Sequence, residues 1–191
     1  MIAQLSGRLI EKNPTELVID CGGVGYEVKI SLNTFSALSS EEAIKVFTKL
    51  IVREDAHILY GFATKEEREM FTNLIAVSGI GPNTAMIMLS SLIPEEIAHA
   101  IQREDVQTIQ SIKGIGAKTA QRVILDLKDK VSKMNFGTEN IFSQNNTNRF
   151  DALTALISLG FDKKSADKAI DKIDTGSESV EQLIKGALKL L

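Results

Sequence analysis

The chain has 191 residues, of which 43% are hydrophobic and 25% charged, and it carries a net charge of −3 with a pI near 5.5. One cysteine, Cys21, and two histidines, His57 and His99, exclude an internal disulfide and a zinc site built from these residue types. No apolar run approaches the ~20 residues that span a bilayer, and no signal peptide opens the chain, so we expect a cytoplasmic protein without a membrane partner.

Residues 1–62 carry the pattern of an all-β domain. Short, partly alternating segments rich in Val and Ile predict five strands, at 2–10, 16–21, 25–30, 43–53 and 57–62, with one short helix at 34–38. Asn13-Pro14 and Gly22-Gly23 favour turns between strands. Five short strands and one helix fit a small barrel, and the expected architecture is an oligonucleotide-binding (OB) fold.

The periodicity becomes helical in residues 63–134. Thr64-Lys65-Glu66-Glu67 has the spacing of a capping box, in which a threonine and a glutamate cap each other's backbone N–H groups. The helix that follows places four apolar side chains on one face: Met70, Phe71, Leu74 and Ile75. Further helices are expected at 82–92, 94–101, 105–111 and 117–131.

One short pattern occurs twice in this helical region. Val77-Ser78-Gly79-Ile80-Gly81 and Ile112-Lys113-Gly114-Ile115-Gly116 have matching glycines 35 positions apart. In each copy an apolar helix meets a Gly-Ile-Gly turn and a second helix begins at once, which is the layout of a helix-hairpin-helix. We expect the central isoleucines, Ile80 and Ile115, to point inward and fix each turn to its helices.

Both turns suit the binding of phosphate. Glycine permits a positive φ and lets a ligand approach the main chain closely. The first N–H groups of the next helix have no partner within that helix, and the helix dipole adds positive potential there. A purely structural corner is the alternative for each copy alone, but a repeated unit favours a shared function. We therefore interpret the turns as sites for a nucleic-acid backbone.

The charges differ between the two copies. From 109 to 125 the only charged residues are Lys113, Lys118 and Arg122, whereas the first copy has Asn83 where a basic side chain would help. The segment from Gly116 to Thr119 resembles the end of an ATP-binding P-loop, but alanine replaces the glycine before the lysine and no strand precedes it. No nucleotide, metal or other cofactor is expected.

The last part of the chain predicts a small adaptor. Residues 135–149 are polar and Asn-rich without a period, which indicates a flexible linker. Three short helices are expected to follow, at 150–159, 163–173 and 179–190. A unit of about forty residues has a small core, so we expect it to serve as a tethered docking module.

The chain resembles the RuvA family of Holliday-junction proteins over essentially its whole length. The resemblance lies in the order of its parts: a barrel, paired hairpins, a linker and a three-helix unit. Local strings carry the resemblance as well: GGVGYEV at 22–28, VREDA at 52–56, LYGF at 59–62, both Gly-Ile-Gly turns, and LISLGF at 156–161. The Leu-Gly-Phe corner is also similar to ubiquitin-associated (UBA) domains. The expected fold class is thus α+β multidomain, with an OB barrel (1–62), a double helix-hairpin-helix domain (63–134), a linker (135–149) and a UBA-like module (150–191).

The resemblance implies a structure-specific DNA-binding subunit without chemistry of its own. By this resemblance, four subunits form a homotetramer that holds a four-way junction open on a concave face. The homotetramer recruits RuvB, a hexameric ATPase, for branch migration in homologous recombination, DNA repair and the SOS response. Whether one tetramer or an octamer of two facing tetramers binds stays open, as does a contact with the junction resolvase RuvC.

The resemblance also assigns residues to the DNA contact. The implied phosphate-binding set is Gly79, Gly81, Asn83, Gly114, Gly116, Lys118, Thr119 and Arg122. Family members often have a basic residue where this chain has Asn83 and Ala117, so main-chain donors are expected to dominate. Glu54 and Asp55 correspond to the family's acidic pin, which repels phosphates at the junction centre. Without the resemblance they are an ordinary solvated turn.

Four apolar residues are implied as the contact with the motor: Leu156, Leu159, Phe161 and Leu188. Each is equally a candidate for the core of a three-helix module.

Two other functions stay open. One is a junction nuclease that uses Glu54 and Asp55, although two adjacent acids without a third make a poor two-metal site. The other is a general duplex-binding repair protein of the hairpin type.

Overall fold

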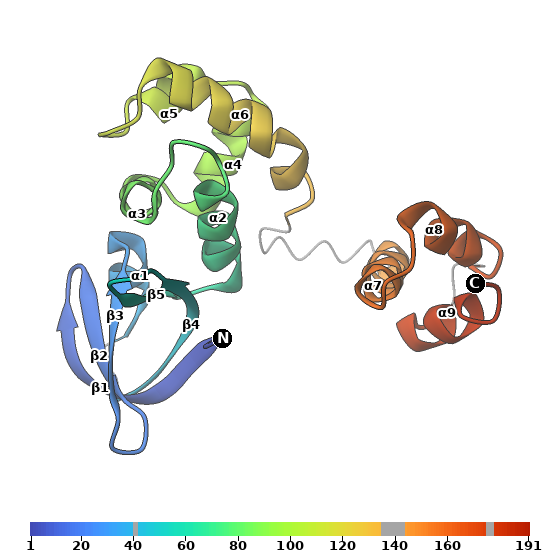
Figure 1. Ribbon diagram of the computed structural model, residues 1–191, viewed down its shortest axis with the longest axis horizontal. Coiled ribbons are helices and arrows are strands. Elements are labelled where there is room, and N and C mark those ends of the chain that lie inside the picture. The colour runs from blue at the N-terminus through green and yellow to red at the C-terminus, as the bar shows by residue number, and fades with distance from the viewer. Residues whose placement is uncertain (40–41, 135–143, 175–177) are drawn as a thin grey trace. The chain divides into compact units, whose positions relative to one another are not determined.

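The computed structural model describes residues 1–39, 42–134, 144–174 and 178–191. The chain divides into two compact units, Met1–Phe136 and Gly137–Leu191 (Figure 1). The first unit contains a barrel and a group of helices, and the second contains three helices. Within the described residues, no helix has the length and apolar character needed to cross a bilayer.

A closed five-stranded barrel forms the first part of the chain, as predicted. Its strands follow the order β1-β2-β3-β5-β4 around the barrel, where β3 and β5 are parallel and all other neighbours antiparallel. The strands are β1 (Gln4–Asn13), β2 (Glu16–Asp20), β3 (Gly25–Ile30), β4 (Ala43–Val52) and β5 (His57–Phe62). Alternate residues point inward, and the interior is closed by Leu5, Leu17, Ile19, Val28, Ile30, Ile44, Val46 and Leu59.

A buried carboxylate connects the barrel to the helices. Helix α1 (Leu32–Ala37) begins earlier than predicted because the Ser31 side chain accepts a hydrogen bond from the Thr34 N–H at 2.9 Å. Helix α2 (Lys65–Ile75) begins at the predicted Thr64 cap, but the Glu67 carboxylate accepts from the Ala63 N–H (3.3 Å) in place of the Thr64 N–H that a capping box requires. It accepts hydrogen bonds from the hydroxyls of Ser31 (2.5 Å) and Thr34 (2.6 Å). Burial raises the pKa of Glu67, and these two hydroxyls oppose that rise.

The central helices share a core with the barrel. They are α3 (Pro82–Ser91), α4 (Pro94–Gln102), α5 (Val106–Gln110) and α6 (Ala117–Val131). Tyr60 and Phe62 of β5 leave the barrel interior and pack on Phe71 of α2, each with a ring-centroid distance of 5.0 Å. The expected boundary after residue 62 therefore separates two kinds of secondary structure, but the packing continues across it.

The second unit packs α7 (Gln144–Ser158), α8 (Lys163–Asp171) and α9 (Val180–Ala187) around a small core. Helix α7 begins before the predicted start at 150, so the last part of the predicted linker is helical; residues 135–143 lie outside the described residues. Arg149 explains the difference, because its guanidinium forms ion pairs with Asp167 (2.7 Å) and Asp171 (2.5 Å) of α8. Arg149 lies in the second turn of α7, so this long-range contact stabilises the N-terminal part of a helix whose Asn-rich start has a low helix propensity.

Candidate nucleic-acid interface

The two Gly-Ile-Gly turns have the same backbone structure. Gly79 has a φ of +96° and Gly114 a φ of +90°, a region that favours glycine. In the first turn the Ile80 N–H donates to the Val77 carbonyl at 3.0 Å. In the second, the N–H of Ile115 donates to the carbonyl three residues earlier at 3.1 Å. The predicted duplication of a helix-hairpin-helix is therefore also a duplication of backbone geometry.

The central isoleucines point inward, as expected. Ile80 and Ile115 are each 5% exposed and belong to one core cluster. Ala85 and Ala120, one turn into the following helices, are fully buried. Because both turns are fixed to the same core, the backbone groups at their tips have defined positions.

Each turn leads directly into a helix whose N-cap is glycine. Gly81 precedes α3 and Gly116 precedes α6, both with extended backbone angles. Glycine has no side chain that could accept from the first helical N–H groups, whereas Thr64 caps α2 in this way. Those donors, with the positive end of the helix dipole, can hold an anion.

The turns also have room for a ligand. A methyl group added at Gly81, Gly114 or Gly116 would meet no heavy atom of the described residues within 4 Å. A phosphate can therefore approach the main chain at these three positions without displacing a side chain. At Gly79 the added methyl carbon would lie 3.8 Å from both Cγ2 and Oγ1 of Thr119.

This short distance between Gly79 and Thr119 shows that the two hairpins are neighbours. Thr119 lies in the first turn of α6, so a residue of the second hairpin lies beside the tip of the first. The family resemblance implied a role for Thr119 in phosphate binding but did not reveal this proximity. The side chain of Thr119 is half-buried.

Positive charge is concentrated on the second hairpin. Lys113, Lys118 and Arg122 are exposed, and no carboxylate of the described residues lies within 4.0 Å of them. Asn83 of the first hairpin is exposed but neutral. Exposed cations without a partner strengthen the attraction of the second turn for a polyanion.

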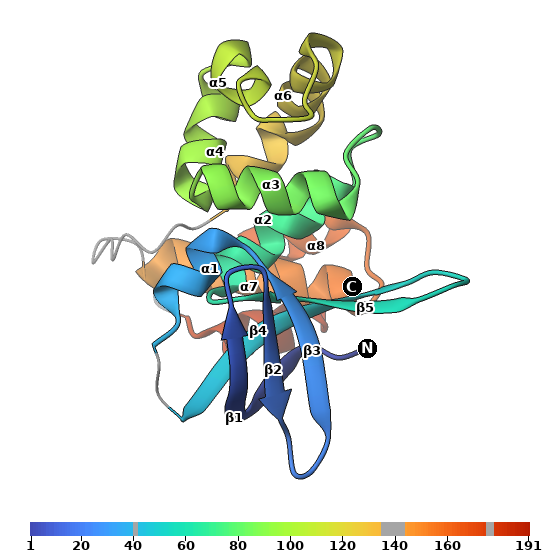
Figure 2. The same ribbon diagram turned by 90° about the vertical axis from the view of Figure 1, so that its left-hand side faces the viewer.

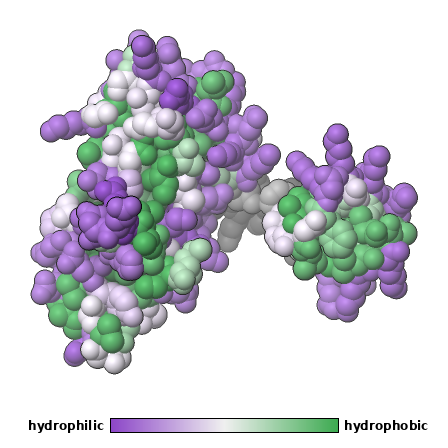
Figure 3. All heavy atoms as spheres, viewed as in Figure 1, coloured by the Kyte–Doolittle hydropathy of each residue, from purple (hydrophilic) through white to green (hydrophobic). Residues whose placement is uncertain are grey.

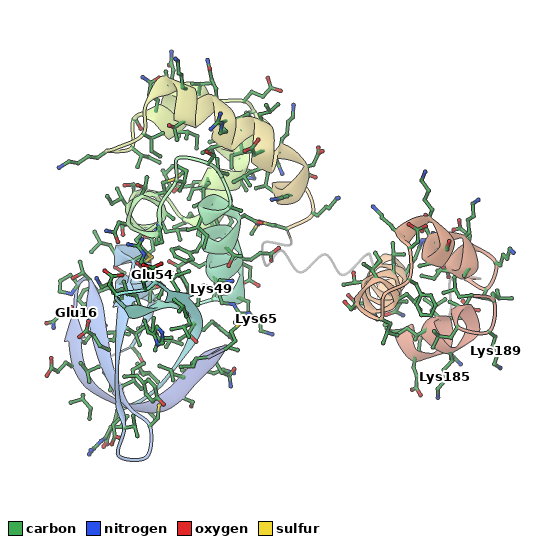
Figure 4. All side chains as sticks on the ribbon, in the orientation of Figure 1. Glu16, Lys49, Glu54, Lys65, Lys185 and Lys189 are labelled. Carbon is green, nitrogen blue, oxygen red and sulfur yellow. The ribbon has the colours of Figure 1, made fainter. Side chains whose placement is uncertain are left out.

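The predicted acidic turn projects from the barrel. Glu54 and Asp55 are exposed between β4 and β5, in a turn closed by the Arg53 N–H donating to the Ala56 carbonyl at 2.8 Å. Figure 2 shows this hairpin extending as an arm on the same side as the turn before α3, and Figure 4 labels Glu54. No group of three or more His, Cys, Asp or Glu side chains suited to a metal ion occurs among the described residues.

In the second unit, the C-terminal end of α7 fixes the position of the Leu-Gly-Phe corner. Gly160 has a φ of +98°, and two hydrogen bonds close the end of α7: Gly160 N–H to the Ile157 carbonyl (3.0 Å) and Phe161 N–H to the Leu156 carbonyl (3.2 Å). This is a Schellman motif, which pairs the apolar residues on either side of the glycine. Leu156 and Phe161 accordingly pack in or against the core.

The four residues expected at a motor contact thus divide into two pairs. Leu156 is fully buried and serves the core, so it is left out of any contact surface, and Phe161 is half-buried. Leu159 is 63% and Leu188 42% exposed. Among the described residues of this unit, three further apolar side chains are exposed: Ile157, Leu190 and Leu191. Figure 3 shows apolar residues gathered on the visible face of this unit, bordered by hydrophilic ones.

Comparison with known proteins agrees with this architecture. Residues 1–61 match the family described as RuvA N terminal domain, 71–129 the SAM-like helix-hairpin-helix tandem, and 147–191 the RuvA, C-terminal domain. Relatives over the full length of both chains are 57% identical in Christiangramia forsetii and 55% in Flavobacterium psychrophilum. A relative in Neisseria gonorrhoeae is 42% identical over 99% of this chain and all of its own. All three carry the name Holliday junction branch migration complex subunit RuvA.

Proposed function

The chain belongs to the RuvA family, and from that membership we propose that it binds four-way DNA junctions and recruits a RuvB ATPase for branch migration. The observation that carries the proposal is the pair of glycine-capped helix starts on open turns. A four-way junction has the same bases as duplex DNA and differs in the path of its phosphates. Two anion sites that are fixed to one core can bind phosphates that follow such a path, and they do so without contacting the bases.

Two substitutions test the phosphate sites without disturbing the fold. In Gly81→Ala/Gly116→Ala the new methyl groups meet no described atom within 4 Å and the φ angles, −86° and −83°, are ordinary. Each change costs less than about 1 kcal/mol of stability, as alanine replaces glycine at an N-cap. The methyl groups occupy the space that phosphates need, so junction affinity should fall.

Gly25→Ala is the matched control. A methyl group there makes an ordinary contact at 3.6 Å with Val18 in the barrel, away from both turns. Gel-shift titration with a synthetic junction should show weak binding for the double variant and unchanged binding for the control. Equal affinity of the double variant and the parent would contradict the phosphate sites.

The acidic turn is proposed to provide selectivity. Glu54 and Asp55 are exposed on a projecting arm, and four copies in a homotetramer would place eight carboxylates around one centre. Such a charge repels phosphates that cross it and so disfavours linear duplex. Glu54→Gln/Asp55→Asn should raise the affinity for duplex and reduce the preference for junctions in a competition of equal-length substrates. An unchanged preference would refute this role.

The second unit is proposed to dock on the motor through Leu159 and Leu188. Leu159→Ser/Leu188→Ser, made in the full chain, should abolish stimulation of the ATPase while leaving junction binding intact. Val24→Ser, at a residue that is 54% exposed in the turn between β2 and β3, is the matched control because it removes similar apolar surface elsewhere. Loss of junction binding in the leucine variant would contradict this division of labour.

Three further parts of the proposal have simple tests. Native mass measured with and without a junction distinguishes the proposed homotetramer from an octamer. Labelled junctions incubated with Mg²⁺ should stay intact, since we propose no chemistry for this subunit; cleavage would favour a nuclease that uses the acidic turn. Equal affinity for junction and duplex would instead favour a general duplex-binding protein. A cytoplasmic location fits all of these roles.

A further inference from the structure

A cluster of positive charge lies outside both hairpins, where β4 meets the start of α2. Three cations surround the ring of Phe47: the Lys45 Nζ at 5.3 Å from the ring centroid, the Lys65 Nζ at 5.9 Å and the Arg68 Cζ at 5.6 Å. Lys49 follows on the same strand. We call these four cations and Phe47 the β4–α2 patch.

Strand and helix periodicity bring the patch together. Lys45, Phe47 and Lys49 alternate along β4 with Ile44, Val46 and Thr48, which are buried. The first set therefore faces outward. Lys65 and Arg68 are three residues apart on α2, which places them on one helix face. Figure 4 labels Lys49 of β4 and Lys65 at the start of α2.

The cations of the patch have no acidic partner in the described residues: no carboxylate there lies within 4.0 Å of any of them. Among the described residues, their only side-chain hydrogen bond runs from the Arg68 Nη1 to the Ala3 carbonyl at 2.8 Å, and a neutral carbonyl leaves the positive charge uncompensated. Arg149 of the second unit is the opposite case, with carboxylates on three sides. Like charges brought together repel, and an anion from outside the chain relieves that repulsion.

The surroundings of the patch indicate which anion it binds. Lys49 lies five residues before Glu54 on the same arm, roughly 17 Å along an extended strand. A DNA strand repelled by the acidic turn thus has an attractive surface within a short distance. Phe47 is half-buried with cations over it, so the ring holds charges in place and is not free to stack on a base.

We propose that the β4–α2 patch binds the phosphate backbone of a DNA strand, as a contact additional to the two hairpin turns. The proposal rests on the junction-binding function proposed above. It adds to that function a positive surface on the barrel itself, close to the turn that repels phosphate. The contact recognises charge and not sequence.

The test compares junction binding across a range of salt concentrations. Lys45→Gln/Lys65→Gln should reduce the magnitude of the log–log salt slope by about 2, one for each lost phosphate contact. Affinity at moderate salt should fall roughly tenfold. Lys163→Gln/Lys164→Gln, two exposed lysines at the start of α8, is the control because it removes the same charge from the second unit.

The possible outcomes separate this inference from the proposed function. Failure of the parent protein to bind junctions would contradict the proposed function itself. Binding by the parent with an unchanged slope and affinity in Lys45→Gln/Lys65→Gln would overturn the inference alone. A changed native mass with an unchanged slope would also overturn it, since the patch would then contact a second copy of the chain. Thermal unfolding monitored by circular dichroism checks that the variant folds.

Discussion

The first and second hairpins have the same backbone but different chemistry. Both use a glycine with positive φ, a buried isoleucine and a glycine N-cap. Only the second is surrounded by cations. The comparison separates two contributions to anion binding, the main-chain N–H donors and the charge of side chains. The first turn offers main-chain donors alone, and the second offers main-chain donors together with side-chain charge.

The main-chain donors also differ. Pro82 occupies the first position of α3 and has no N–H, so Asn83 and Thr84 provide the donors there. Helix α6 begins with Ala117 and offers one donor more in its first three residues. The first hairpin should therefore contribute less to affinity than the second, while both contribute equally to the fold.

The largest expected effect tests whether the two turns contribute equally to the stability of the fold. Ile80→Ala and Ile115→Ala should each lower the free energy of unfolding by about 2–5 kcal/mol, since both remove a buried side chain from one core. Urea denaturation measures both values. A difference of more than about 2 kcal/mol between the two variants would show that the turns are not equivalent structural units.

The next effect concerns charge on the second hairpin. Lys118→Gln/Arg122→Gln should weaken junction binding by about 2 kcal/mol and reduce the magnitude of the salt slope by about 2. Lys130→Gln/Lys133→Gln, near the other end of the same helical segment, serves as the control in a filter-binding salt titration. If both double variants lose affinity equally, general electrostatics would explain the result better than a local site.

A smaller effect should appear when charge is added to the first hairpin. Asn83→Lys places a cation in the first turn of α3, at an exposed position. Junction affinity should rise by about 1 kcal/mol, with a steeper salt slope by about 1. Isothermal titration at two salt concentrations measures both quantities. No gain would mean that the first turn does not lie against phosphate.

The smallest effect tests the contact between the hairpins. Thr119→Ala removes the γ-carbon that lies near Gly79 and should cost about 0.8 kcal/mol of stability. Thr119→Val keeps that carbon and should stay within about 0.5 kcal/mol of the parent. Equal stability of the two variants in urea denaturation would show that Thr119 does not support the first turn.

The sequence by itself determined the barrel, both Gly-Ile-Gly turns and the inward direction of Ile80 and Ile115. These features depend on the spacing of apolar residues and on glycine, which act over a few positions of the chain. The candidate phosphate sites could be predicted for the same reason, because a helix start and its free donors are local. Their role in DNA binding remains a prediction.

Only the tertiary structure decided which distant side chains meet. Glu67 follows a cap signal but turns to hydroxyls near α1, and Arg149 extends α7 into a segment expected to be a linker. Thr119 lies beside the tip of the other hairpin, and the β4–α2 patch joins a strand to a helix. Each of these contacts closes a loop of many residues, and its geometry depends on how whole elements pack, which no short sequence pattern contains.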